Sequence, residues 1–361
     1  MTWPSHGSNP HYLYEAAGLK KPDHVLDFSA NINPFGPPSS IQENWIDFFQ
    51  GIWQYPDPHT ASLKGKLAER EGVLKEQILI GNGGAEMISL IGRLLAGKKV
   101  LIVEPAFSEY EKACQINDCD ISYFQLAEGW EIDSDALRKK LSQVDAVFFC
   151  NPNNPTGLYY PLKTILPILR ECETQNCFLI VDEAFHDFLM EYEPLSPLIK
   201  EYTRLILLRS LTKMFAIPGL RLGYAIASRE IITKLSDYRP HWSVNSVALA
   251  VGDICVAEKN YIEETVQFIH SEREKLVAFY EKNGFEVSYS KVNFYLLRDP
   301  QLVDPYPLFQ FLLQKGIVPR HTFNFPGLEG RWLRFAIRNR EENQKLKEAM
   351  QEWRMIHPLS L

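Results

Sequence analysis

Residues 178–185 read Phe-Leu-Ile-Val-Asp-Glu-Ala-Phe, an unbroken apolar run that leads into two carboxylates. A strand that is apolar at every position, and not only at alternate ones, is covered on both faces. Four more mainly apolar runs occur, at residues 77–80, 100–103, 146–150 and 205–208. Helical spacing follows several of them, as with Ile88, Ile91 and Leu95 after the first. The alternation predicts an α/β fold with a mostly parallel central sheet.

A change of composition divides the chain into two parts. With 361 residues, the chain has the length of about two domains. Beyond residue 246, longer helical segments rich in Glu and Lys replace the earlier rhythm, and a strand pair follows near 292–297 and 332–337. We therefore predict a large domain, residues 46–245, and a smaller α+β domain formed by both chain ends, residues 1–45 and 246–361.

Composition and charge narrow the classes of function. Apolar residues make up 45% of the chain and charged residues 23%, and the formal charge is −7. Such a chain lacks the positive surface that holds a phosphate backbone, which disfavours nucleic-acid binding. No apolar run approaches the roughly 18 residues of a membrane span, and residues 1–14 show no signal-peptide pattern. The Cys, His and Glu residues show no metal-binding spacing. We expect a cytoplasmic enzyme with reduced thiols and without a metal, a nucleic-acid partner or membrane contact.

Polar or glycine-rich clusters stand at the predicted carboxyl ends of four strands. In open α/β sheets ligands bind at this edge, because loops converge there and helix N-termini point toward it. One such cluster is weak support, but four on one edge predict a site. The clusters are Gly81-Asn82-Gly83-Gly84-Ala85-Glu86, Asn151-Pro152-Asn153-Asn154-Pro155-Thr156-Gly157, Asp182-Glu183-Ala184-Phe185 and Ser210-Leu211-Thr212-Lys213.

Lys213 is the most informative residue of these clusters. It follows the hydroxyls of Ser210 and Thr212, and Arg221 lies eight residues further on. Hydroxyls and a guanidinium bind phosphate, and a partly desolvated lysine has the lowered pKa that suits imine formation. Asp182, at the end of an apolar strand, needs a cationic partner or water. A surface lysine and a helix N-cap are the ordinary alternatives for Lys213 and Asp182.

Together these groups fit pyridoxal 5′-phosphate. This cofactor needs a lysine for its imine, a phosphate cup, a carboxylate at the pyridine nitrogen and a partner for its ring face. Phe107 can cover the ring, although core packing explains an aromatic residue there equally well. Asn154 can donate to the ring oxygen O3′. The turn 81–86 either binds phosphate or is an ordinary strand–helix turn, and Glu86 rules out a dinucleotide fingerprint.

The chain resembles, over essentially its whole length, the fold-type I pyridoxal-phosphate enzymes of the aminotransferase class I and II group. Within that group it is most similar to the threonine-phosphate decarboxylases of cobalamin synthesis, with the histidinol-phosphate aminotransferases as near neighbours. The motifs that carry the resemblance are Asn154-Pro155-Thr156-Gly157, Asp182-Glu183-Ala184, Ser210-Leu211-Thr212-Lys213 with Arg221, the opening His6-Gly7-Ser8-Asn9, residues 26–34, 216–224 and 242–245, Arg320, and residues 324–328 and 334–338.

The resemblance implies a role for each matching residue around the cofactor. Lys213 would bind the cofactor covalently, Asp182 would pair with its pyridinium, and Phe107 would stack on its ring. Asn154 would contact O3′. The residues implied to bind the cofactor phosphate are Gly83, Gly84, Ser210, Thr212 and Arg221, with Tyr55 reaching it from the partner subunit of a homodimer.

The resemblance also implies a substrate site. Arg334 would clamp the substrate carboxylate, and His6, Asn31 and Arg320 would meet its phosphate. A planar guanidinium binds either anion in a two-point fork that lysine cannot make. The implied reaction is the decarboxylation of L-threonine O-3-phosphate to (R)-1-aminopropan-2-ol O-phosphate for cobalamin synthesis.

Two alternatives stay open. One is an aminotransferase acting on a phosphorylated amine such as histidinol phosphate. Aminotransferases of the group usually carry a tyrosine three residues after the aspartate, where this chain has Phe185 and is similar to the decarboxylases. The other is a non-catalytic binding protein that keeps the fold, although the chain shows no basic helix-turn-helix segment. His186 and Asp187, the next residues, are expected on a helix surface.

Overall fold

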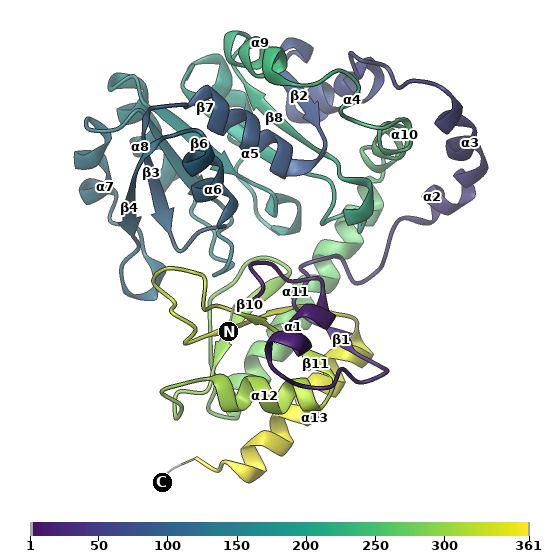
Figure 1. Ribbon diagram of the computed structural model, residues 1–361, viewed down its shortest axis with the longest axis vertical. Coiled ribbons are helices and arrows are strands. Elements are labelled where there is room, and N and C mark those ends of the chain that lie inside the picture. Colours follow the sequence, from purple (N-terminus) through teal and green to yellow (C-terminus); the bar gives the residue numbers. More distant parts are fainter. Residues whose placement is uncertain (1–2, 360–361) are drawn as a thin grey trace.

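A seven-stranded sheet forms the upper part of the computed structural model, which describes residues 3–359 (Figure 1). Its strands run in the order β2-β8-β7-β6-β5-β3-β4, and only β8 runs antiparallel to its neighbours. The strands are β2 (Ile78–Gly81), β8 (Gly223–Ala227), β7 (Leu205–Ser210), β6 (Phe178–Asp182), β5 (Ala146–Cys150), β3 (Lys99–Glu104) and β4 (Asp120–Gln125). The prediction of a mostly parallel central sheet is therefore confirmed.

Helices cover both faces of this sheet, which explains the unbroken apolar runs. Ile180 of β6 packs in a cluster with the helices on one face, and its neighbours Leu179 and Val181 pack with those on the other. The first face carries α5 (Gly83–Leu94), α6 (Glu109–Ile116) and α9 (Arg229–Tyr238). The second carries α4 (Ala61–Glu71), α7 (Ser134–Leu141), α8 (Leu162–Thr174) and α10 (Ser246–Cys255).

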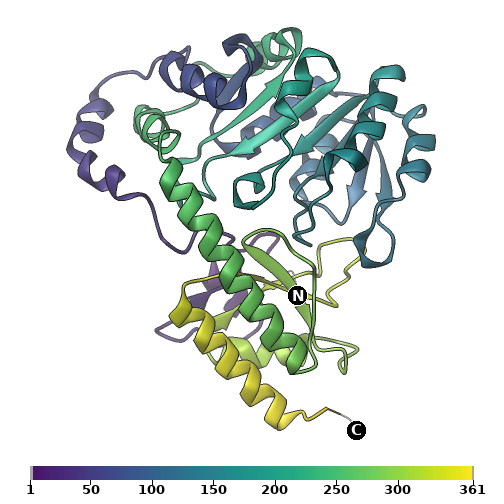
Figure 2. The same ribbon diagram turned by 180° about the vertical axis from the view of Figure 1, so that it is seen from behind.

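A smaller part lies below, and both ends of the chain build it (Figures 1 and 2). β1 (Leu26–Asp27) pairs in parallel with β11 (Ile317–Val318), so residues almost 300 positions apart share one sheet. A second sheet has the order β12-β13-β10-β9. Its strands are β12 (Arg320–His321), β13 (Leu333–Ala336), β10 (Phe294–Arg298) and β9 (Glu286–Val287). The sequence predicted a strand pair near 292–297 and 332–337 without a direction, and β10 and β13 form this pair in antiparallel orientation.

The remaining helices connect and flank the two parts. The long helix α11 descends from the upper part and runs beside α13 (Figure 2). These helices are α1 (Pro10–Ala16), α2 (Ser39–Glu43), α3 (Trp45–Gln50), α11 (Lys259–Lys282), α12 (Tyr306–Gln314) and α13 (Arg340–Ile356). The division into a large domain, residues 46–245, and a small domain, residues 1–45 and 246–361, stays our proposal. The helix α10 begins directly after residue 245, and it packs on α3 and α4.

The sequence analysis did not predict two strands of the large sheet, β4 and β8. β4 lies at the sheet edge, where only Phe124 of its six residues is buried, so it carries no apolar run. β8 is fully buried, but it reads Gly-Tyr-Ala-Ile-Ala, and small residues gave it no strong strand signal. Among residues 3–359, no helix has both the length and the apolar character that crossing a membrane requires.

Candidate active site

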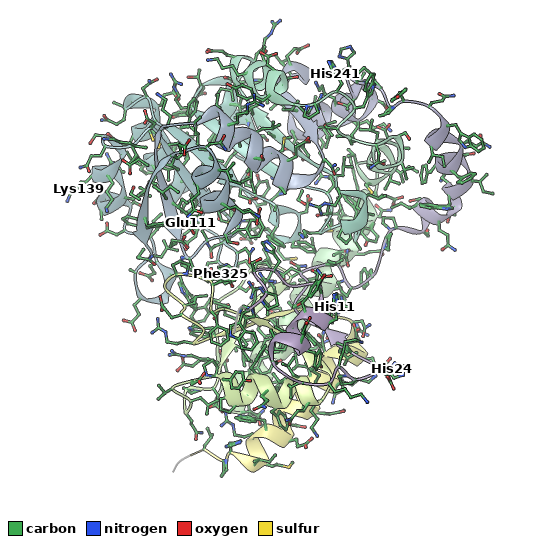
Figure 3. All side chains as sticks on the ribbon, viewed as in Figure 1. His11, His24, Glu111, Lys139, His241 and Phe325 are labelled. Carbon is green, nitrogen blue, oxygen red and sulfur yellow. The ribbon has the colours of Figure 1, made fainter. Side chains whose placement is uncertain are left out.

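A cavity of about 490 Å³ lies at the carboxyl edge of the large sheet, where residues of both parts of the molecule line it. Phe325 is one of them, and Figure 3 shows it at the junction of the two parts. The structure brings most of the predicted site residues to this cavity. They are His6, Asn31, Gly84, Phe107, Asn154, Asp182, Ser210, Thr212, Lys213, Arg221, Arg320 and Arg334.

Parallel strand ends explain why these distant residues meet. Asp182 is the last residue of β6, and Ser210 is the last residue of the adjacent, parallel β7. Beside Ser210 stands Gly223 of β8. A Cβ on Gly223 would lie 2.8 Å from the backbone nitrogen of Gly84, so glycine is required where β8 meets the start of α5.

Asp182 and Lys213 occupy a desolvated region of the cavity. The backbone N–H of Ala184 donates to Asp182 Oδ1 (3.0 Å), and the Tyr110 hydroxyl donates to Oδ2 (2.5 Å). Burial raises the pKa of Asp182, and these two hydrogen bonds and Lys213 oppose the rise. Burial, with Arg221 and Arg334 nearby, lowers the pKa of Lys213 to about 8. A minor fraction of Lys213, about one-tenth at pH 7, is therefore an uncharged, nucleophilic amine.

Hydroxyl, guanidinium and backbone donors gather at the end of β7 and the start of α5. Ser210 Oγ and Thr212 Oγ1 lie 2.8 Å apart. Gly83, the first residue of α5, has φ +80°, and a Cβ there would come within 2.9 Å of Arg221 Nη2. Gly83 itself does not line the cavity, but the guanidinium and the helix N-terminus meet beside it. This donor set suits a phosphate group.

Two arginines form the opposite wall of the cavity. Arg320 of β12 and Arg334 of β13 are register partners, and both are buried. Within the described part of the chain, neither guanidinium has a carboxylate within 4.0 Å, because their donors go to backbone and amide oxygens. Burial lowers the pKa of Arg334 to about 9 and that of Arg320 to about 10. Two like charges directly opposite one another repel, and a bound anion would relieve this repulsion. This wall of the cavity therefore favours the binding of anions.

Two further polar residues complete this wall. Asn31 is buried, and its Oδ1 finds no hydrogen-bond partner among the described residues. His6 lies at the cavity mouth, where its Nε2 is 3.0 Å from Glu109 Oε1 and its ring centroid is 5.6 Å from that of Phe107. The N-terminal segment therefore touches the start of α6 across the entrance.

Tyr55, like Gly83, is a predicted site residue that does not line the cavity, and it lies in a different environment. Its side chain is 81% exposed, and its ring centroid lies 4.7 Å from that of Trp242. Trp242 is also half exposed. Tyr55 therefore contributes nothing to the cavity of its own chain.

Tyr110 is a site residue that the sequence analysis missed. Its hydroxyl reaches Asp182, 72 positions away. Phe107 lies two residues before α6, and the Tyr110 N–H donates to its backbone oxygen (3.2 Å), so this turn brings both side chains to the cavity. The three-residue spacing between Phe107 and Tyr110 was the available signal.

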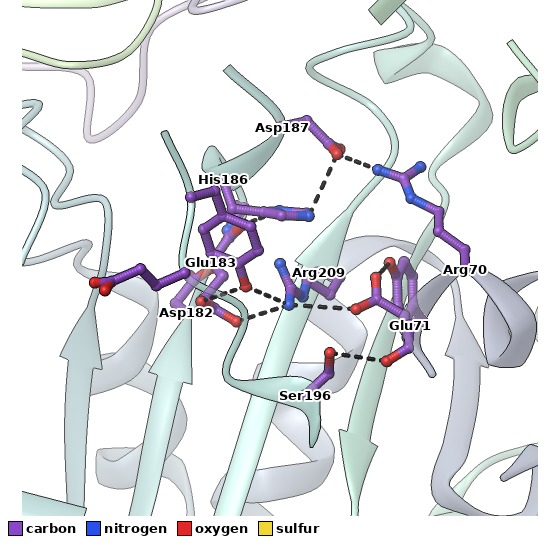
Figure 4. A network of polar contacts seen from close by, with 12 residues as sticks. Arg70, Glu71, Asp182, Glu183, His186, Asp187, Ser196 and Arg209 are labelled. Carbon is purple, nitrogen blue, oxygen red and sulfur yellow. Dashed lines mark hydrogen bonds and ion pairs between the residues drawn. The ribbon is translucent and has the colours of Figure 1, made fainter. Parts of the chain in front are cut away.

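The analysis also missed a buried ionic network behind the cavity (Figure 4). Arg209 Nη2 lies 3.0 Å from Glu183 Oε2 and 3.4 Å from Glu71 Oε2, and it donates to the Tyr192 hydroxyl (2.7 Å). The Tyr224 hydroxyl donates to Glu71 Oε1 (2.6 Å). Glu183 follows Asp182 and Arg209 precedes Ser210, so the network joins the strand ends that carry the site.

The expectation that His186 and Asp187 lie on a helix surface is wrong. Both side chains are buried at the edge of this network (Figure 4). Asp187 forms an ion pair with Arg70 of α4, and His186 Nδ1 donates to the backbone oxygen of Glu183 (2.8 Å). Burial lowers the pKa of His186 to about 4, so the ring is neutral. The reason is tertiary, because α4 and α11 pack over this turn.

The fold and the cavity define an α/β enzyme with a nucleophilic lysine, a buried carboxylate and two anion-binding walls. The family model described as aminotransferase class I and II matches residues 23–350. This chain belongs to that family.

Individual relatives are similar over nearly the whole chain. The threonine-phosphate decarboxylase of Salmonella typhimurium is 34% identical over 350 residues, which cover 96% of this chain and 95% of that protein. The adenosylcobalamin biosynthesis bifunctional protein CobDQ of Leptospira interrogans is 35% identical over 97% of this chain, which spans 41% of that longer protein. The crystal structure of a histidinol-phosphate aminotransferase from Clostridium acetobutylicum has a TM-score of 0.88 and 32% identity, covering 92% of this chain and 100% of that one.

Proposed function

We propose that the protein decarboxylates L-threonine O-3-phosphate to (R)-1-aminopropan-2-ol O-phosphate, a step of cobalamin synthesis, with pyridoxal 5′-phosphate as cofactor. The observation that carries the proposal is the pair Arg320 and Arg334, both buried and both without a carboxylate partner among residues 3–359, across the cavity from Lys213. A substrate with both a carboxylate and a phosphate satisfies both guanidinium groups. The Salmonella and Leptospira relatives support this reading.

The cavity residues fit this cofactor in charge and in shape. Lys213 supplies the amine, Asp182 the carboxylate for the pyridine nitrogen, and Phe107 a ring face. The donors suited to its phosphate are those of Gly83, Gly84, Ser210, Thr212 and Arg221. When bound, pyridoxal phosphate supplies a conjugated ring that accepts the electrons of a bond broken at the substrate Cα.

The chain's own residues then determine which bond breaks. Arg334 holds the substrate carboxylate, and Arg320, with His6 and Asn31, holds the phosphate, so the substrate is fixed at two points. Binding energy from the remote phosphate would be used to orient the substrate, so that these residues select its carboxylate as the group to leave. Lys213 Nζ delivers the proton to Cα after carbon dioxide leaves.

The alternative of an aminotransferase rests on the same anion-binding wall, and Phe185 bears on the choice. It lines the cavity and packs edge-on against Phe294, with ring centroids 4.8 Å apart. Because phenylalanine has no hydroxyl, position 185 offers no hydrogen bond to O3′. This absence favours the decarboxylase.

Incubation with threonine phosphate tests the reaction. We expect the holoenzyme to release carbon dioxide in the absence of any 2-oxo acid, measured by trapping the gas and by chromatography of the amino alcohol phosphate. Histidinol phosphate with 2-oxoglutarate serves as the comparison. Turnover that requires the 2-oxo acid would show that the protein is an aminotransferase instead.

Arg320→Met should weaken recognition of the phosphate. A lost hydrogen bond to a charged group corresponds to roughly 2–3 kcal/mol, or about a 30- to 150-fold higher KM for threonine phosphate. The preference for threonine phosphate over threonine should fall by a similar factor, measured from kcat/KM for both compounds. The control is Arg331→Met, because Arg331 is exposed and lies in the segment between β12 and β13. It should change neither value. An unaltered preference in Arg320→Met would place the phosphate elsewhere.

We also propose a homodimer in which Tyr55 reaches the cofactor phosphate of the partner subunit. Tyr55 is exposed and lies outside its own cavity. The preceding segment exposes a series of large apolar side chains, and such patches mark protein interfaces. They are Trp45, Ile46, Phe49, Ile52 and Trp53.

We place the enzyme in the cytoplasm, because its six cysteines are free thiols.

A further inference from the structure

Tyr110 is held rigidly against the carboxylate at the floor of the cavity. It is the second residue of α6, and its side chain is only 1% exposed. Its ring lies parallel to that of Phe148, with centroids 5.0 Å apart, and meets Phe107 edge-on at 5.9 Å. Two aromatic contacts therefore fix the ring from which the hydroxyl donates to Asp182 Oδ2 at 2.5 Å.

Several groups influence the charge of Asp182, and the Tyr110 hydroxyl is one of them. The ionisable groups around it are Tyr110 of α6, Cys150 of β5, Lys213 beyond β7, and Glu183 of its own segment. Burial favours the neutral acid. Of the interactions that favour the carboxylate, the Tyr110 hydrogen bond is the largest, ahead of the Ala184 N–H and Lys213.

The backbone donor alone does not secure the orientation of the carboxyl group. Ala184 N–H engages Oδ1 and leaves Oδ2 to Tyr110. Glu183 Oε1, the next carboxylate, is occupied by the Tyr192 hydroxyl and faces the ionic network, so it does not compensate for a change at Asp182. Among the described residues, no donor other than the Tyr110 hydroxyl forms a hydrogen bond with Asp182 Oδ2.

We propose that Tyr110 is a positioning residue that keeps Asp182 ionised and oriented toward the pyridine nitrogen of the cofactor. The proposal rests on the proposed function, since it presupposes pyridoxal phosphate in the cavity. Asp182 as a carboxylate holds a proton on that nitrogen, whereas a protonated Asp182 Oδ2 does not. The phenol–carboxylate hydrogen bond biases the shared proton toward the nitrogen.

Tyr110→Phe is the test, because it deletes the hydroxyl and keeps the packing against Phe148 and Phe107. The first measurement uses the apoprotein and needs no cofactor. Infrared difference spectroscopy during a pH titration follows the C=O band of the protonated carboxyl group, and Asp182→Asn identifies the band. We expect the midpoint of this titration to rise by about one to two pH units in Tyr110→Phe.

The second measurement is the dissociation constant of pyridoxal phosphate, obtained by fluorescence titration of the apoprotein. We expect it to rise roughly tenfold in Tyr110→Phe, in line with one pH unit. Tyr160→Phe is the matched control, because its buried hydroxyl donates to the backbone oxygen of Trp130 (2.6 Å) and not to Asp182. Tyr160→Phe should leave the infrared midpoint and the dissociation constant unchanged.

The outcomes separate this proposal from the proposed function. An unchanged midpoint in Tyr110→Phe, or an equal shift in Tyr160→Phe, overturns the role of Tyr110 while the cofactor assignment stands. A raised midpoint with unchanged cofactor affinity also overturns it. Wild-type protein that binds no pyridoxal phosphate overturns the proposed function itself.

Discussion

Lys213→Ala is expected to lower turnover of threonine phosphate by roughly a thousandfold or more, since one amine performs two tasks. In the function we propose, its Nζ would attach the cofactor and would later return the proton to the substrate Cα. The position supports this expectation, because burial lowers the pKa of Lys213 to about 8, so the amine is partly uncharged near neutral pH. Carbon dioxide release measures the turnover, and borohydride reduction followed by peptide mapping locates the cofactor label.

Lys112 provides the matched control. It is the other lysine that lines the cavity, but its side chain is 65% exposed and lies near Glu109. Lys112→Ala should keep turnover within a few-fold of wild type, and its reduced holoprotein should carry the label on Lys213. Full turnover in Lys213→Ala, or a label on another residue, would contradict the assignment of the nucleophile.

Arg209→Met is expected to lower the free energy of unfolding by about 3–5 kcal/mol, the usual cost of leaving buried charges without their partner. The Arg209 guanidinium contacts Glu71, Glu183 and the Tyr192 hydroxyl, and its side chain is fully buried. Burial raises the pKa of Glu183 to about 7, and Arg209 opposes that rise. Urea denaturation followed by tryptophan fluorescence measures the loss.

A charge-neutral network separates the ionic effect from the loss of volume. Adding Glu71→Gln and Glu183→Gln to Arg209→Met removes the unpaired charges, so most of the lost free energy of unfolding should return. Arg138→Met breaks exposed ion pairs with Asp135 and Glu171 and should have a much smaller effect. If Arg209→Met is no more harmful than Arg138→Met, the buried network does not stabilise the fold.

Much of the large sheet could be predicted from local patterns. A strand covered on both faces must be apolar at every position, and this rule located β2, β3, β5, β6 and β7. β4 failed the same rule because only one of its six residues is buried, whereas β2, at the other edge of the sheet, is buried at every position. Many of the cavity residues could be predicted from the sequence for a related reason, because polar groups that directly follow parallel strands lie at the same edge of the sheet.

Contacts between distant segments were beyond such patterns. Nothing in the spacing of residues showed that Tyr110 meets Asp182, or that Arg70 reaches Asp187. His186 was misplaced because its burial depends on α4 and α11, which lie far away in the sequence.

The amino-acid sequence alone therefore determined the α/β class, the edge of the sheet that carries the cavity, and the presence of Lys213 and Asp182 at that edge. These features depend on periodicity and on residue type, which act over a few neighbouring positions. The tertiary structure decided which charges are buried, which arginines face one another across β12 and β13, and which hydroxyl donates to the Asp182 carboxylate. Those outcomes depend on how separate elements pack, because packing alone sets the distance and the loss of water between groups far apart in the chain.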